Sequence, residues 1–222
     1  MSDRFINSSS VSAEIFFSGI PLWDIQVNGY PVLMILWNLA LAIVALLLAY
    51  RFVSLGTDTK RTPLALAVTA FLWLVFLPNT AYMITDIRHI IGYCPAEEYG
   101  NVCAENAWMS VFFFAYAVAG WISFVLAVRP VRSMMDRRFG ARRANVFFYV
   151  LMPLVSLGVL LGLVNRWNSW EIFTDPFLIL GTLTRYVTDV VYLKNWILLT
   201  ILLFGLYFLG ERLFNRLPWE RK

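Results

Sequence analysis

Residues 63–89 read PLALAVTAFLWLVFLPNTAYMITDIRH, and this stretch decides the fold. Its first part, Pro63–Thr85, carries no charge and is long enough, as a helix, to cross about 30 Å of hydrocarbon. Four further stretches have similar length and apolar character: Pro31–Val53, Ala107–Val128, Asn145–Val164 and Trp196–Leu213. The sequence therefore predicts an all-α, polytopic transmembrane helix bundle with about five spans.

The composition favours the same environment for most of the chain. Of the 222 residues, 60% are hydrophobic and 14% are charged, which lies outside the usual balance of soluble globular proteins. Without a repeat or a long linker, a single helical domain is expected over residues 31–217. Residues 1–30 are predicted to be an extracytoplasmic N-terminal segment, with the apolar patch Ile15–Trp23 at the interface and not in a cleaved leader. Residues 218–222 are the predicted cytoplasmic tail.

Basic residues divide unevenly between the segments that connect the spans. Most of the 18 lysines and arginines lie in the loop around Gly56, in the run Arg129–Arg143 and at the C-terminus. Because basic residues near span ends are retained in the cytoplasm, the N-terminus is predicted outside and the C-terminus inside. The net charge of +4 then indicates contact with membrane lipids and not with nucleic acid. A patch that binds nucleic acid or a protein partner is the alternative for the arginine run.

The two cysteines, Cys94 and Cys103, fall in the loop between the second and third spans. The charge distribution places this loop outside, where disulfides persist. A bridge between them would close a short loop and contribute roughly 2–3 kcal/mol in the chain-entropy treatment. Two unpaired thiols are the alternative.

A surface helix is predicted before the last span. Asp175 and Pro176 have the form of a helix cap followed by proline at the first helical position. Apolar residues then recur at helical spacing: Ile179, Leu183, Tyr186, Val187 and Val190. Because the segment is too short and too charged to span, we expect a helix from about Pro176 to about Leu193 on the outer surface.

Pro78 interrupts the second predicted span before it leaves the membrane. Proline has no backbone N–H, so the carbonyl of Leu74 loses its helical partner and needs another one in hydrocarbon. The side chains of Asn79 and Thr80 are the predicted partners.

Polar residues recur in the outer halves of several spans. Counting 1.5 Å per residue places Asn38 and Asn79 at one depth, with Tyr116, Ser156 and Thr200 in the outer halves of their own spans. These groups predict a polar pocket that opens outward. The alternative is that each is an ordinary interhelical hydrogen-bond partner, as is common in membrane bundles.

Asp86 and His89, the chain's single histidine, lie one helical turn apart and share a helix face. Such a pair suits acid–base catalysis, in which the carboxylate orients an imidazole whose pKa is near neutrality. A metal ion would need a third ligand such as Glu171, which makes a metal site the weaker interpretation. A structural pair at a helix end is the other alternative.

A second polar cluster, NRWNSWE at Asn165–Glu171, follows the fourth span. Trp167 and Trp170 fit an aromatic belt at the headgroup level, and Arg166 could bind a lipid phosphate or pair with a carboxylate. The two clusters are predicted on the same side of the membrane, so they could form one site.

Together, LPNxxYxxTDxxH at 77–89 and RWNSWE at 166–171 resemble a bacterial membrane family of unknown function, DUF1361. The resemblance implies a multi-span protein of a bacterial cytoplasmic membrane. It implies no activity and no cofactor. The residues that it marks are Asn79, Tyr82, Thr85, Asp86, His89, Arg166, Asn168, Ser169 and Glu171.

Three functions remain open from the sequence. The leading hypothesis is a protein that binds a polar or lipid-linked ligand at its outer face, with Arg166 as the anion-binding group. Its predicted hydrogen-bonding groups are Asn79, Asn168 and Asp86. The second is an extracytoplasmic acid–base or metal-assisted enzyme acting on a lipid or envelope substrate, with catalysis by Asp86 and His89. The third is a transporter, because interrupted spans commonly line solute paths.

Overall fold

The computed structural model describes residues 25–27, 30–57, 62–91, 107–167, 169 and 171–216. The predictions for the N-terminal segment, for the Cys94–Cys103 bridge, for Asn168 and for the tail concern residues outside this described part.

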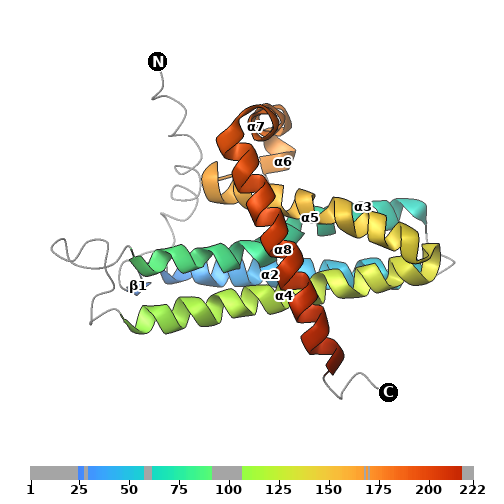
Figure 1. Ribbon diagram of the computed structural model, residues 1–222, viewed down its shortest axis with the longest axis horizontal. Coiled ribbons are helices and arrows are strands. Elements are labelled where there is room, and N and C mark those ends of the chain that lie inside the picture. The colour runs from blue at the N-terminus through green and yellow to red at the C-terminus, as the bar shows by residue number, and fades with distance from the viewer. Residues whose placement is uncertain are drawn as a thin grey trace.

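Five long helices make up most of the described chain (Figure 1): α2 (Val32–Thr57), α3 (Pro63–Thr85), α4 (Trp108–Phe139), α5 (Ala141–Val164) and α8 (Val190–Arg216). Each is long and apolar enough to cross a membrane. The predicted all-α bundle with five spans is therefore confirmed, and the chain is a multi-pass membrane protein. The shorter elements are the antiparallel pair β1 (Gln26–Val27) and β2 (Tyr30–Pro31), the 3-10 helix η2 (Asp86–Ile91), α6 (Glu171–Thr174) and α7 (Pro176–Thr188).

The helices α2, α3 and α4 pack against one another, and α5 packs against both α3 and α4. Helix α8 crosses α4 and α5 obliquely (Figure 1). The short helix η2 continues α3 and packs against α4. We call the end of the bundle where α2 begins and α3 ends the η2 end.

Small residues bring α4 and α5 close to α3, as is usual between membrane helices. A Cβ atom built on Gly120 of α4 would lie 2.6 Å from the Cβ of Met83 and 2.8 Å from the carbonyl oxygen of Thr80. A Cβ built on Gly158 of α5 would lie 2.5 Å from the Cγ of Pro78. Helix α3 is therefore held on two sides just below the η2 end.

The contact between α3 and α5 repeats every four residues. Gly162 lies against the ring of Tyr82, and Gly158 lies against Pro78 one turn below. One turn further, Leu74 and Leu154 line the same cavity. This line of contacts, which we call the α3–α5 seam, runs from the η2 end toward the middle of the bundle.

The run Arg129–Arg143, expected as a loop, is almost wholly helical. Helix α4 continues through Pro130 to Phe139, and α5 begins at Ala141. Between them only Gly140 is non-helical, with a φ of 83° that glycine adopts at little cost. Arginine is a good helix former, so these charged residues extend the helices beyond the apolar spans.

Arg132 connects three helices at the opposite end of the bundle. Its guanidinium lies 3.2 Å from a carboxylate oxygen of Glu211 on α8 and 3.2 Å from the side-chain oxygen of Asn145 on α5. It also stacks 4.5 Å above the ring of Phe148. These contacts join α8 to α4 and α5.

The helix expected before the last span exists as α7, but it ends at Thr188 and not near Leu193. Asp189 causes the break, because its carboxylate accepts a 2.8 Å hydrogen bond from the backbone N–H of Val191 and so caps α8. Of the predicted apolar face, Ile179 and Tyr186 are buried, whereas Val187 is exposed.

Candidate functional site

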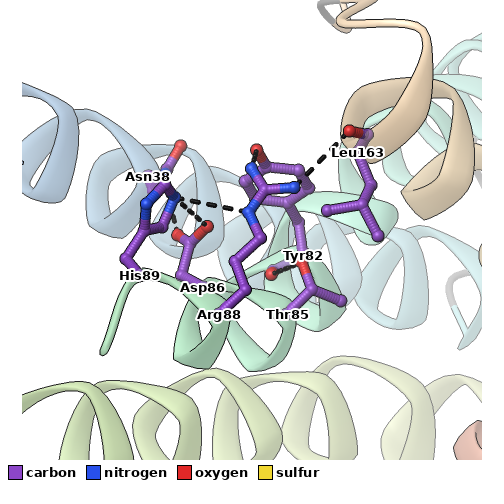
Figure 2. A network of polar contacts seen from close by, with 7 residues as sticks. All are labelled: Asn38, Tyr82, Thr85, Asp86, Arg88, His89 and Leu163. Atoms are coloured by element: carbon purple, nitrogen blue, oxygen red, sulfur yellow. Dashed lines mark hydrogen bonds and ion pairs between the residues drawn. The ribbon is translucent and has the colours of Figure 1, made fainter. Parts of the chain in front are cut away.

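Asp86 lies where α3 ends and η2 begins, at the centre of the polar network drawn in Figure 2. Its backbone N–H bonds to the carbonyl of Met83, which tightens the last turn into the 3-10 helix. The residue is only 1% exposed, and its Oδ2 atom accepts a 3.3 Å hydrogen bond from the amide of Asn38 on α2. A carboxyl group is thus buried between α2, α3 and α4.

The other oxygen of this carboxyl group lacks such a partner. Asp86 Oδ1 is buried and accepts no hydrogen bond from a described residue. His89 Nε2 lies 3.8 Å away, beyond hydrogen-bond distance. The hydroxyl of Tyr116, buried on α4 beside Asn38, likewise makes no hydrogen bond of normal geometry within the described part.

His89 is turned toward Arg88 and an aromatic ring. Its Nε2 atom lies 3.4 Å from the Arg88 Nε, which can only donate, so this nitrogen acts as an acceptor. The imidazole packs 5.8 Å from the ring of Phe113 on α4. The side chain remains 25% exposed, so it is accessible from the η2 end.

Arg88 bridges η2 to α3 and α5 through long contacts (Figure 2). Its guanidinium donates to the hydroxyl of Tyr82 at 3.4 Å and to the backbone carbonyl of Leu163 at 3.5 Å. Contacts of this length are weak. Arg88 forms no ion pair with a carboxylate among the described residues.

Arg166 sits in an unusual backbone conformation directly after α5. Its φ is 61°, in the left-handed region that costs a non-glycine residue roughly 1–2 kcal/mol. The turn brings the N–H of Trp167 to 3.1 Å from the carbonyl of Leu161. The side chain is exposed, and its charge acts on both Asp86 and His89. A second guanidinium therefore belongs to the same end of the bundle as Arg88.

The two polar sequence clusters meet in space. The amide nitrogen of Asn79 on α3 lies 2.9 Å from the hydroxyl of Ser169, within hydrogen-bond distance. Together with the Arg88–Leu163 contact, this bond attaches the turn after α5 to the end of α3. The sequence alone could not establish that these spans are neighbours.

The family model described as "Protein of unknown function (DUF1361)" matches residues 37–209. The chain belongs to the DUF1361 family. No curated protein and no solved structure is significantly similar to this DUF1361 protein. The matched range includes every residue of the network around Asp86 and the whole turn around Arg166.

The prediction that Asn79 or Thr80 of this DUF1361 protein bonds to the carbonyl of Leu74 is wrong. The side chain of Asn79 donates to the carbonyl of Phe76, and that of Thr80 donates to the carbonyl of Leu77. Short side chains reach the carbonyl three residues earlier more easily than one further away. Thr85 similarly bonds to the carbonyl of Tyr82.

The predicted polar pocket is divided among separate helix contacts. Asn38 and Asn79 face different helices, and each finds its own partner, Asp86 and Ser169. Ser156 and Thr200 pair with each other at 2.6 Å between α5 and α8. For these two residues the interpretation as interhelical hydrogen-bond partners is the correct one.

Glu171 begins α6 and is 9% exposed. Within the described part of this DUF1361 protein, no three histidine, cysteine or acidic residues are placed to hold a metal ion. Asp86, His89 and Glu171 therefore do not form a ligand set there.

Sequence reasoning missed two residues of this region. The sequence patterns assigned no role to Arg88, although an arginine between Asp86 and His89 at a membrane boundary is a usable signal. Tyr186 of α7 donates a 2.8 Å hydrogen bond to the side-chain oxygen of Asn165, next to Arg166. Burial raises the pKa of Tyr186 above its ordinary value, so its hydroxyl keeps the proton that it donates.

Proposed function

We propose that this DUF1361 protein binds an anionic ligand, polar or lipid-linked, at the extracytoplasmic end of its helix bundle. The observation that carries the proposal is the pair of guanidiniums at the η2 end. Neither Arg88 nor Arg166 forms an ion pair with a carboxylate among the described residues. Arginine is well suited to phosphate and carboxylate groups because it donates two parallel hydrogen bonds.

The membrane and its sides belong to the same proposal. The basic residues concentrate at the end opposite η2, which favours a cytoplasmic location for that end and for the C-terminus. A bacterial cytoplasmic membrane, with the N-terminus outside, is the setting that we infer. The η2 end then meets the outer headgroup region, where anionic groups are abundant.

In this proposal each site residue has a separate role. Arg166, exposed on its turn, makes the first contact with the anion. Arg88 is half-buried and held only by long contacts, so it can reorient toward the same group at little cost. Asn79 and Ser169 fix the turn that carries Arg166.

The left-handed conformation of Arg166 provides a sharp test. Arg166→Gly removes the charge and also relieves the backbone strain, so the protein should melt at the same or a higher temperature. Its affinity for vesicles that contain an anionic lipid should fall about tenfold or more, because a charged hydrogen-bond donor is lost. The measurement is a flotation or titration assay with purified protein.

Two matched variants complete this experiment. Arg166→Lys keeps the charge but loses the bidentate geometry, and should bind with intermediate affinity. Arg185→Gly removes an exposed arginine from α7 and should leave binding unchanged. Equal binding by wild type and Arg166→Gly would contradict the proposed function.

A further inference from the structure

We infer that the ligand is a lipid whose anionic headgroup is held by Arg88 and Arg166 while one hydrocarbon chain lies in a cavity on the α3–α5 seam. This inference rests on the proposed function and deepens it, because a free anion would need the arginines alone. It assigns a second binding surface, within the spans, to the same ligand.

The cavity extends from about the middle of α3 and α5 toward the end opposite η2, where Phe52 of α2 and Phe147 of α5 line it. Its volume is about 220 Å³, and it is open on one side. Apolar side chains line it almost exclusively, from α2, α3 and α5. Phe71, Val150 and Leu154 of this lining are exposed at the bundle surface, so the opening faces the hydrocarbon of a membrane. Such a surface suits an alkyl chain and offers nothing to a polar solute.

The cavity and the arginines are connected along one line of contacts. At the η2 end, Tyr82 accepts a hydrogen bond from Arg88 and packs on Gly162. Eight residues below Tyr82, Leu74 lines the cavity, a distance of about 12 Å along the helix. That separation, to the near edge of the cavity, is shorter than a membrane lipid's hydrocarbon chain, since half of the hydrocarbon layer is about 15 Å thick, so a long chain would enter the cavity from this edge.

Along the α3–α5 seam, positive charge is found only at the η2 end, which matches a lipid with an anionic headgroup and an apolar chain. The two guanidiniums lie at the end of the bundle, whereas the cavity lining carries no charged side chain. Helix α6 covers one edge, because Phe173 packs edge-on against Phe71 at 6.1 Å. Since Arg166 precedes α6 by a few residues, the turn that holds the headgroup also leads to the element beside the cavity.

The closing experiment separates the headgroup from the chain. Binding of palmitoyl lysophosphatidylglycerol, whose single chain is long enough to reach the cavity, and of glycerol phosphate is measured by titration calorimetry in a maltoside detergent, with four proteins: wild type, Val150→Trp, Val146→Trp and Arg166→Gly. Val150 lines the cavity and is 56% exposed. Val146 is 59% exposed one turn earlier on the same helix and does not line it, so it controls for the bulk of tryptophan.

For wild type and Val146→Trp we expect the lipid to bind about tenfold or more tightly than glycerol phosphate, because a chain adds buried apolar area. In Val150→Trp that advantage should shrink at least to about a third, with glycerol phosphate binding unchanged. Leu154→Phe, a smaller change in the same lining, should act in the same direction if Val150→Trp folds poorly. Arg166→Gly should weaken the binding of both ligands.

The possible failures are distinguishable. Unchanged lipid affinity in both Val150→Trp and Leu154→Phe overturns the chain site and leaves the headgroup site intact. Unchanged affinity in Arg166→Gly overturns the proposed function itself. A change of oligomeric state in Val150→Trp alone, measured by light scattering, would assign the groove to a second copy of the chain and overturn the lipid inference.

Discussion

At the scale of single residues, the bundle depends on a buried carboxyl group with few partners. Asp86 is almost fully enclosed and accepts one hydrogen bond from a described residue, the amide of Asn38. A buried charged or polar group that loses its partner carries the full cost of its removal from water. Asn38 therefore stabilises the end of α3 by more than an ordinary exposed hydrogen bond would.

We predict that Asn38→Ala lowers the free energy of unfolding by about 1–3 kcal/mol, because it leaves Asp86 buried without a donor. Thermal unfolding in detergent, followed by circular dichroism, measures the change. The double variant Asn38→Ala with Asp86→Ala should recover part of the loss, since neither partner is then left alone. Asn195→Ala, at an exposed position on α8, is the control. If the double variant loses as much unfolding free energy as Asn38→Ala and Asp86→Ala lose together, the two side chains are not coupled and the prediction is wrong.

Much of the site's composition was readable from the sequence, but its pairings were not. The motif residues Asn79, Asp86 and Arg166 do lie at one end of the bundle. Depth counting could not tell which helix face each side chain occupies, and it treated every span as perpendicular to the membrane. It therefore paired Asn38 with Asn79, whereas Asn38 bonds to Asp86. The catalytic role of Asp86 and His89 stays a prediction.

At the scale of helices, the apolar runs predicted the spans well because nothing competes with a helix in hydrocarbon. The ends were harder to place. Helix α4 continues to Phe139 because arginines tolerate a helix in water as well as a loop. Asp189, which lies inside the predicted helix, instead caps α8 and divides that helix in two. Local capping decided that boundary, and periodicity carries no information about it.

We predict that Gly158→Ala destabilises the protein by about 1–3 kcal/mol, because the new methyl group would overlap the rigid ring of Pro78. Gly181→Ala on α7 is the matched control, since a Cβ there meets no atom within 4 Å and alanine favours the helix. Thermal unfolding of both variants in one detergent makes the comparison. If Gly158→Ala melts at the wild-type temperature, α3 and α5 can move apart enough to accommodate the methyl group, and the prediction is wrong.

At the scale of the whole molecule, the five helices divide their charge between two ends. Arg132, Arg138 and Arg142 lie near the end opposite η2, on the helices joined at Gly140. The network of Asp86, Arg88 and His89 lies at the η2 end. Helix direction and charge together predict which end remains in the cytoplasm, a feature that the apolar patterns alone do not contain.

We predict a cytoplasmic C-terminus. Green fluorescent protein fused after Lys222 should fluoresce, and alkaline phosphatase fused there should be inactive, because it needs an oxidising compartment to form its disulfides. Fusions after Val164, at the end of α5, should give the opposite pair of results. Active phosphatase after Lys222 would reverse the orientation and move the arginine site to the cytoplasmic face.

The single non-helical residue between α4 and α5 has a consequence for how the protein is made. Because only Gly140 separates them, we expect the two helices to insert into the bilayer as one hairpin, with neither far ahead of the other. Its tip carries arginines, and because charged side chains are expensive to move across hydrocarbon, we expect the tip to stay on the side of synthesis. We therefore expect the hairpin to anchor the nascent chain before α8, which follows it in the sequence, docks against it through Arg132.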